Sequence, residues 1–419
     1  MISRRPSIPT RRVVVTGLGA VSPLGTDVPT LWQALVEGRT GVRAWPALAE
    51  VRGLHCRVAA LVPDVDARGI DRKKRRYMSQ MSIFATLAAR EALANAGLTD
   101  AQVRHERTGV CVGSTVGSTI ETEEFFRGMS PGRSIEQLKS THFFKVMNSS
   151  CAANLAQALG ISGRAVAPSA ACATGTIAVG LGAECIAAGK QDVMICGGAD
   201  ELHPLGIGVF DALEAASRSY NDRPEETPRP FDKDRDGIIC GEGAGMVVLE
   251  SLEHAQLRGA RVLGEILGFA LTSAPDAIAS PSAHAIVQCL TTALAESGLS
   301  SDRVDHVNAH ATGTIQGDEA ECLAIEQVLG RDVPVSSLKG HMGHTMAASG
   351  ALALIATLLM MRNGLLVPTR NLREPDEVCG RLRLLREVEP LPVTVAMVNS
   401  FALGGMNSAV VVSGRLLDE

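Results

Sequence analysis

A cysteine stands where a predicted strand gives way to a helix of small residues. Cys172 follows an extended segment, lies between Ala171 and Ala173, and opens this helix. The positive end of the helix dipole favours a thiolate there, and the free N–H groups can stabilise a tetrahedral oxyanion. Cys172 is therefore a candidate nucleophile for acyl transfer, with a buried structural cysteine as the alternative.

Cys151 is the competing cysteine. Ser149 or Ser150 can cap a helix that opens beside it. No strand is predicted directly before Cys151, so it would not reach the sheet edge where sites of α/β proteins form. We interpret Cys151 as structural.

Two histidines occupy similar turns in the second half of the chain. His310 follows a predicted strand at 304–308, and His344 follows Gly343 at the start of an apolar helix. Each alone is more often structural. Two histidines and a cysteine at the same kind of strand-to-helix turn predict one shared site, in which Lys339 and Glu321 hold the imidazole rings in one tautomer and orientation.

A metal site is the rival interpretation of these three side chains. Their spacing contains no local ligand pair apart from His341 and His344. We therefore expect no metal.

The elements that must position these residues alternate between short buried strands and Ala-rich helices. Strands are predicted at 109–113, 193–198 and 245–250, and helices at 81–96 and 176–188. Residues 13–15 predict a strand that ends in a glycine turn at 16–19. This turn is not a dinucleotide fingerprint, because Ser22 stands where the third glycine is needed.

The second half resembles a weak copy of the first. The strand, turn and helix around Cys172 have a counterpart that begins near Val335 and continues into a helix at 346–360. An internal duplication would give one double-core unit, with halves at 1–255 and 256–419 and a seam near 253–261. The order of elements predicts an α/β layered sandwich.

The bulk composition is that of a globular protein without a basic surface for nucleic acid. The chain has 419 residues, 46% hydrophobic and 20% charged, and a net charge of −5. Its 10 cysteines include no CxxC pair, and residues 1–12 lack the apolar core of a secretory signal. No uninterrupted apolar stretch reaches the length of a membrane span. We expect a cytoplasmic protein with reduced thiols that binds neither nucleic acid nor membranes.

Five motifs in order carry a family resemblance. They are Ala170–Gly175, Arg229–Gly237, Asn308–Thr314 with Gly317–Glu321, Lys339–His344, and Asn399–Asn407. Over residues 11–413 the chain resembles β-ketoacyl-acyl-carrier-protein synthases, and in particular the bacterial elongating synthases I and II.

This resemblance implies a thiolase-like five-layer αβαβα sandwich that works as a homodimer. It implies transfer of an acyl chain from the phosphopantetheine arm of acyl carrier protein to Cys172, with no resident cofactor. Malonyl carrier protein then loses CO₂ and attacks the acyl thioester, while His310 and His344 stabilise the enolate. Lys339 and Glu321 organise the two histidines.

The resemblance also implies binding roles. The backbone N–H groups of Cys172 and Leu403 form the oxyanion hole, and Thr312 and Thr314 line the pantetheine channel. Val116 limits the depth of the acyl pocket. Residues expected at the substrate are Val116, Thr312, Thr314, Phe401 and Leu403.

Some positions depart from the family pattern. The family usually has glycine at the positions of Ala311 and Ala402, phenylalanine at Leu403 and threonine at Met406. Leu403 is at the usual gate between the acyl and malonyl pockets. The pathway therefore stays open between fatty-acid elongation and a dedicated polyketide or polyene pathway.

A run of five basic residues, 72–76, is either a solvated helix face or a docking surface. In the family, the matching positions receive the acidic helix of the carrier protein. The expected docking residues are Arg72, Lys73 and Arg76, extended by Arg127, Arg133 and Lys139.

Two alternatives share the fold. A thiolase normally uses a second cysteine as base, and a chain-length-determining partner subunit usually lacks the nucleophile. Cys172, Lys339 and His344 fit a decarboxylating synthase better. A heterodimer with a related subunit stays open beside the homodimer.

Overall fold

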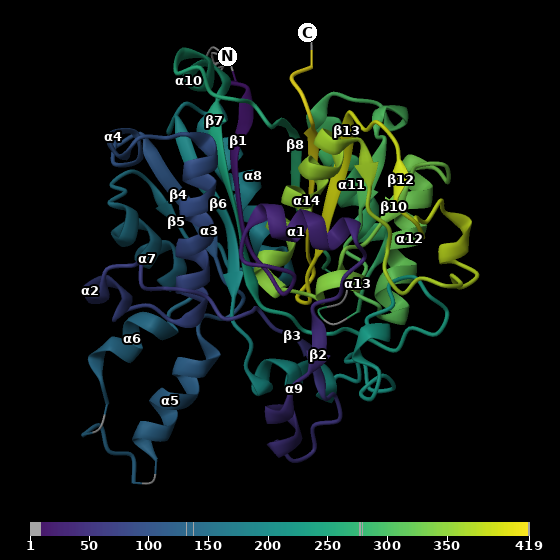
Figure 1. Ribbon diagram of the computed structural model, residues 1–419. Helices are drawn as coiled ribbons and strands as arrows, with labels where there is room; N and C mark the ends of the chain where they lie inside the picture. The colour runs from purple at the N-terminus through teal and green to yellow at the C-terminus, as the bar shows by residue number, and fades with distance from the viewer. Residues whose placement is uncertain (1–9, 131, 137, 276–277, 279, 418–419) are drawn as a thin grey trace, which may run out of the picture.

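The chain folds into two similar halves that share one long sheet (Figure 1). The structure is a computed structural model that describes residues 10–130, 132–136, 138–275, 278 and 280–417. The segment expected to lack a secretory signal lies largely outside these residues, since the description begins at residue 10.

The two half-sheets have the same strand pattern. The first consists of β1 (Val13–Val21), β7 (Gly243–Ser251), β6 (Val193–Asp200), β4 (Thr108–Gly113) and β5 (Ala165–Val166). The second consists of β8 (Gly264–Ser273), β14 (Met406–Ser413), β13 (Val395–Phe401), β9 (His306–Asn308) and β10 (Val335–Ser336). In each half the first two pairings are antiparallel and the last two parallel, and β1 pairs with β8. This repeated pairing is what an internal duplication produces.

Helices form three layers around these half-sheets. The first half-sheet is covered outside by α3 (Gln80–Ala96) and α7 (Ser150–Leu159), and the second by α11 (Ala283–Ser297) and α12 (Ile315–Leu329). Between the half-sheets lie α8 (Thr174–Ala187) and α14 (Ser349–Asn363). The predicted five-layer αβαβα sandwich of the thiolase type is confirmed.

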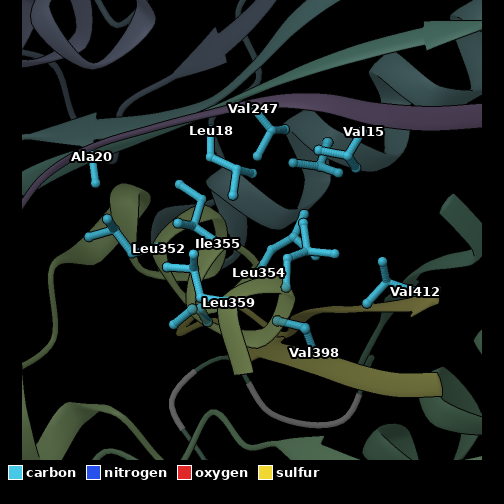
Figure 2. Close-up of a cluster of buried hydrophobic side chains, with 14 of the residues drawn as sticks. Val15, Leu18, Ala20, Val247, Leu352, Leu354, Ile355, Leu359, Val398 and Val412 are labelled. Atoms are coloured by element: carbon cyan, nitrogen blue, oxygen red, sulfur yellow. The ribbon is translucent and has the colours of Figure 1, made fainter. Parts of the chain in front are cut away.

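The middle layer is the main apolar core. Apolar side chains of α14 point towards both half-sheets (Figure 2). Those labelled are Leu352, Leu354, Ile355 and Leu359 of α14, with Val15, Leu18, Ala20 and Val247 of one half-sheet and Val398 and Val412 of the other.

Shorter elements connect the layers or lie outside them. They are α1 (Val28–Val36), β2 (Val42–Ala44), η1 (Pro46–Glu50), β3 (Val58–Ala60), α2 (Arg72–Arg75), α4 (Asp100–Val103), α5 (Thr119–Met129), α6 (Ser140–Val146), η2 (Ala171–Ala173), α9 (Pro204–Ala212), η3 (Pro224–Glu226), α10 (Leu252–Leu257), η4 (Ser301–Arg303), α13 (Lys339–Met342), η5 (Met346–Ala348), β11 (Leu365–Leu366), η6 (Cys379–Arg381) and β12 (Glu389–Pro390).

The predicted glycine turn at 16–19 is wrong, because β1 continues through it to Val21. The glycines serve close packing instead. A Cβ on Gly17 would lie 2.1 Å from the carbonyl oxygen of Ala92, and one on Gly19 would lie 1.8 Å from that of Ala88. These missing side chains let the backbone of α3 approach β1, which is a use of glycine that a sequence pattern does not separate from a turn.

The expectation about membrane-length stretches also needs correction. The helical stretch Met346–Asn363 is long and apolar enough to cross a membrane by length and composition. However, 89% of it is buried inside the protein, as α14 fills the middle layer. Its composition is that of a core helix packed on all sides.

Candidate active site

Cys172 lies in the tight turn η2, directly before α8 begins at Thr174. Ala171 has a φ of 45°, in the left-handed region that a side chain rarely adopts. The Thr174 hydroxyl closes the turn, since it donates to the Ala171 carbonyl and accepts from the Ala170 N–H, each at 2.8 Å. The turn presents the sulfur to the backbone N–H groups of Cys172 and Leu403. These are the two groups expected to form the oxyanion hole.

The thiol does not have the thiolate-favouring environment that its place at a helix start predicted. Burial raises the pKa of Cys172 to about 12, although the charge of Lys339 and the N–H groups of Cys172 and Leu403 lower it. Desolvation outweighs these contributions in a buried turn. The thiol is therefore neutral at pH 7, and it must lose its proton before the sulfur can act as a nucleophile.

His310 and His344 lie beside this thiol. The sulfur and one nitrogen from each ring lie within 4.8 Å of one another. The two imidazole rings pack edge to face, with their centroids 5.2 Å apart. The ring of Phe401 packs against His310 with a centroid distance of 5.9 Å. Burial lowers the pKa of both histidines, and the charge of Lys339 lowers it further. Both rings are therefore neutral at pH 7.

Both histidine rings have hydrogen-bonding capacity to spare. Among the described residues, none forms a hydrogen bond with Nδ1 of His310 or with either ring nitrogen of His344. Buried polar groups normally find partners in the protein, so such atoms indicate that a ligand completes the site.

Glu321 orients His310 through the backbone rather than through the ring, which corrects the expected contact. Its carboxylate accepts hydrogen bonds from the N–H groups of His310 at 2.9 Å and Ala311 at 2.7 Å. It also accepts one from the Asn399 amide at 2.9 Å. The carboxylate thus fixes the loop after β9, and the ring is left free to face the cavity.

Lys339 acts on the site through its charge. Burial lowers its pKa to about 8, while the charges of Glu321 and a Cys172 thiolate raise it. The ammonium is therefore still mostly protonated at pH 7. From this buried place on α13 it favours a thiolate at Cys172 and a neutral ring at His310 and His344.

A cavity of about 500 Å³ opens over these residues. It brings together most of the sequence-predicted site: Cys172, His310, Thr312, Thr314, Glu321, His344, Phe401 and Leu403 line it. The hydroxyls of Thr312 and Thr314 lie 3.1 Å apart. Val116 is not among the lining residues and is 58% exposed, so it does not limit this cavity within one chain.

Known proteins are similar to this chain in sequence over nearly its whole length. Residues 10–255 match the N-terminal domain, and residues 263–373 the C-terminal domain, of beta-ketoacyl synthases. The 3-oxoacyl-[acyl-carrier-protein] synthase 1 of Escherichia coli strain K12 is 37% identical over 404 residues, which are 96% of this chain and 98% of that protein. Nodulation protein E of Rhizobium meliloti strain 1021 is 36% identical over 407 residues, with the same coverage. The chain belongs to the β-ketoacyl synthase family.

Solved structures of ketosynthases agree with this assignment. A β-ketoacyl synthase from Burkholderia phymatum has a TM-score of 0.94 and 39% identity, covering 97% of this chain and 100% of its own. The ishigamide ketosynthase/chain length factor scores 0.90 at 31% identity, covering 96% and 99%. A type II polyketide ketosynthase, bound to its acyl-carrier protein and the hexaketide, scores 0.89 at 30% identity, covering 98% and 100%. The protein is thus a condensing acyltransferase of fatty-acid or polyketide elongation.

The basic run of this β-ketoacyl synthase forms α2, which begins after the N-cap Asp71 and packs near α7. Two of its residues are held by the protein, since Lys74 donates to the Ala158 carbonyl and Arg75 to that of Ala67. The three expected docking residues are exposed: Arg72, Lys73 and Arg76.

The proposed extension of this basic surface is less uniform. Arg127 on α5 forms ion pairs with Glu123 and Glu124, which reduces its charge for a partner. Arg133 and Lys139 are exposed between α5 and α6, the two helices that project at the lower left of Figure 1.

Cys151 lies in the first turn of α7, where it is completely buried, and Ser149 makes no side-chain cap bond. Burial raises its pKa well above the usual range. It faces Ser82 of α3 rather than the cavity. This geometry suits the structural role that the sequence indicated.

Several supporting residues were missed by sequence reasoning. Asn399 holds Glu321, and Ser337 donates to the Ala311 carbonyl at 2.7 Å. Buried Asp200 accepts from the N–H of Ala347 at 2.8 Å, in the turn η5 that faces η2. Asn399 belongs to the Asn399–Asn407 motif, so its role at the site could have been predicted, whereas no sequence pattern indicated a role for Asp200.

Proposed function

We propose that this β-ketoacyl synthase extends an acyl chain held on Cys172 by decarboxylative Claisen condensation with malonyl carrier protein. One observation carries the proposal: the sulfur of Cys172 and a ring nitrogen each of His310 and His344 meet within 4.8 Å beside the cavity. The same three atoms could ligate a metal, but Lys339 adds a positive charge that opposes a cation there. A nucleophile with two neutral N–H donors suits thioester condensation better.

In the first step, the Cys172 sulfur attacks the thioester carbonyl of the incoming acyl chain. The carbonyl oxygen becomes negative, and the N–H groups of Cys172 and Leu403 stabilise it. The bond from this carbon to the carrier's sulfur then breaks. The carrier thiol leaves with a proton equivalent to the one lost by Cys172.

In the second step, the malonyl group loses its carboxylate as CO₂. The electron pair of the broken C–C bond gives an enolate, whose negative oxygen accepts N–H donation from His310 and His344. The enolate carbon attacks the acyl carbonyl, and the bond from this carbon to Cys172 breaks. Lys339 stabilises the departing thiolate until it takes up one proton from the solvent, because the Cys172 proton left with the carrier thiol in the first step.

The stoichiometry of the reaction tests this proposal. Carrier protein loaded with an acyl chain and carrier protein loaded with a malonyl group should together yield CO₂ and 3-oxoacyl product in a ratio of one to one. Product that retains the malonyl carboxylate would show a different condensation. Acyl exchange between carriers without any C–C bond formation would point to a transferase that does not condense.

Substrate delivery needs no resident cofactor in this proposal, since the substrates arrive on the phosphopantetheine arm of acyl carrier protein. Thr312 and Thr314 line the cavity with their hydroxyl oxygens 3.1 Å apart, and this pair can bind the amides of that arm. We also propose a cytoplasmic location. All 10 cysteines are free in the structure, and a reducing compartment would keep them so.

Reversing the charges of Lys73 and Arg76 to glutamate should raise the KM for acyl and malonyl carrier protein severalfold. Each exposed ion pair contributes only about 0.2–1 kcal/mol, but several together steer an acidic partner. Salt should weaken wild-type binding, because exposed charges are screened beyond about 8 Å. Steady-state kinetics at two salt concentrations measures both effects.

A short pantetheine thioester provides the control, since it never reaches α2. Its turnover should not change in the Lys73→Glu/Arg76→Glu variant. A matched charge reversal, Arg386→Glu, alters an exposed residue of the second half near β12 and should leave carrier kinetics alone. Equal losses with both substrates would mean damage to the active site, and no loss would make α2 a solvated helix face.

Leu403 is half-exposed at the cavity, and its N–H lies at the sulfur. We expect Leu403→Phe to narrow the range of accepted acyl chains, because the larger ring fills the mouth of the acyl pocket while the N–H stays in place. Decarboxylation of malonyl carrier protein should change little. Acyl transfer to Cys172 from chains of graded length and unsaturation measures this, and an unchanged profile would remove Leu403 as a gate.

Dimerisation is proposed through the open edge of the first half-sheet. The edge strand β5 is exposed at both residues and contacts α7, which in turn contacts α6. Exposed apolar side chains lie on α6, on α5 beside it, and on α9, whose N-cap His203 pairs with Glu123 of α5. They include Phe126, Phe143, Leu205 and Val209. An unpaired edge beside apolar surface is suited to pairing with a second chain. Val116 is exposed too, so any role in the acyl pocket requires that second chain.

A homodimer is the simpler proposal, and the ketosynthase/chain length factor structure supports a heterodimer as the alternative. Light scattering of the purified chain distinguishes them. A dimer mass supports the homodimer. A monomer that becomes active only with a related subunit would support the heterodimer.

A further inference from the structure

Arg235 connects the two halves of the molecule from a buried position. It lies in the segment between η3 and β7 of the first half, and it is only 4% exposed. Its guanidinium donates to the carbonyl oxygens of Thr314 at 3.3 Å and Ile315 at 3.0 Å, both in the second half. The side chain therefore holds the end of the loop that carries Thr312 and Thr314 by hydrogen bonds.

Asp318 binds the same loop through the loop's backbone N–H groups, whereas Arg235 binds its carbonyl groups. One carboxylate oxygen accepts from the N–H groups of Thr312 at 3.0 Å and Gly313 at 3.2 Å. The other oxygen lies 3.7 Å from the Arg235 guanidinium. Gly313 has a φ of 88°, so the loop turns sharply between the two threonines. The carboxylate and the guanidinium together fix both the donors and the acceptors of this turn.

The consequence is a fixed spacing of two hydroxyl groups at the cavity wall. Thr312 and Thr314 line the cavity, with their oxygens 3.1 Å apart. A planar guanidinium with donors in a rigid fork can hold two successive carbonyls in one geometry, which a flexible ammonium cannot. We infer that Arg235 is a positioning residue that sets the Thr312–Thr314 hydroxyl pair for the amide-bearing arm of the substrate. This inference rests on the proposed function, in which that pair binds the arm.

A purely structural brace is the competing explanation, because Arg235 also donates to the Asp232 carbonyl at 2.9 Å and pairs with Asp376. Substrate length separates the two explanations. An acyl pantetheine thioester carries the amides, whereas an acyl thioester of ethanethiol has the same reacting carbonyl and no amide. A positioning residue affects only the first, while a brace affects both.

The experiment measures acylation of Cys172 by these two thioesters in wild type and Arg235→Lys. We expect kcat/KM for the pantetheine thioester to fall about tenfold, chiefly through KM, as fits the loss of one hydrogen bond to a charged group. The ethanethiol thioester should react within about twofold of wild type, on the same scale. Equal losses with both thioesters, or no loss with either, would overturn the inference.

Three further variants complete the design. Lys233 lies in the same segment as Arg235 and forms an exposed ion pair with Glu374. Lys233→Met removes this ion pair and should change the rate with neither thioester. Arg235→Gln with Asp376→Asn removes both charges of the Arg235–Asp376 ion pair and should show the same selective loss, so the test survives if Arg235→Lys folds poorly. Thr312→Val with Thr314→Val should also lose the preference for pantetheine. If the threonine variant still reacts faster with the pantetheine thioester than with the ethanethiol thioester, as wild type does, the proposed binding role of the threonine pair fails. If the threonine variant loses this preference and the Arg235 variants keep it, only the inference about Arg235 fails.

Discussion

Alanine at His310 or at His344 should slow CO₂ release from malonyl carrier protein by about 10²-fold or more, the usual effect of removing one donor from a developing oxyanion. Both rings are buried and neutral, and each has a nitrogen with no hydrogen-bond partner among the residues that the structure describes. They are therefore free to donate to the enolate oxygen. A radiolabelled malonyl carboxylate gives the rate directly.

Acyl transfer to Cys172 is the internal control for these two variants. Within the described part of the chain, no hydrogen bond joins the thiol to either ring, and the N–H groups proposed for the oxyanion hole belong to Cys172 and Leu403. Acylation should therefore persist in both variants. CO₂ release at the wild-type rate in both would contradict the role of the histidines, and a complete loss of acylation would make them part of thiol activation.

Replacing Cys172 with alanine should abolish condensation, because Cys172 is the one cysteine among the described residues that line the cavity. The substitution removes only a sulfur atom from the turn η2, where Ala171 and Ala173 are already small. The fold and the two histidine rings should stay in place, so CO₂ release from malonyl carrier protein should continue. Product analysis, CO₂ release and thermal unfolding check these three expectations.

Cys151→Ala is the matched control, because it removes a buried thiol from the start of another helix. It should retain condensation. A Cys172→Ala protein that still condenses, or a Cys151→Ala protein that folds normally but does not, would reverse the assignment of the two cysteines.

The turn, helix and strand around Cys172 could be predicted because small residues and short apolar runs are local signals. The duplication was visible for the same reason, and the paired half-sheets bear it out. Gly17 and Gly19 misled the prediction of a turn, since their role depends on α3, more than 60 residues later in the chain. Close approach between distant elements leaves no local pattern.

Electrostatics and contacts of the site needed the three-dimensional arrangement. The start of a helix suggested a thiolate at Cys172, but burial raises the pKa of the thiol to about 12. Glu321 was expected at an imidazole ring and instead binds the backbone N–H of His310. Neither desolvation nor the direction of a carboxylate can be obtained from residue types and spacing.

The acyl adduct itself is the most direct test of the central role of Cys172. Wild-type protein is incubated with carrier protein that is loaded with an acyl chain. Intact-mass analysis and peptide mapping then locate the transferred acyl group. One acyl group per chain should be found, on the peptide that contains Cys172, and malonyl carrier protein should then discharge it as 3-oxoacyl product. An adduct on the Cys151 peptide, or product formation without any adduct at Cys172, would contradict the account.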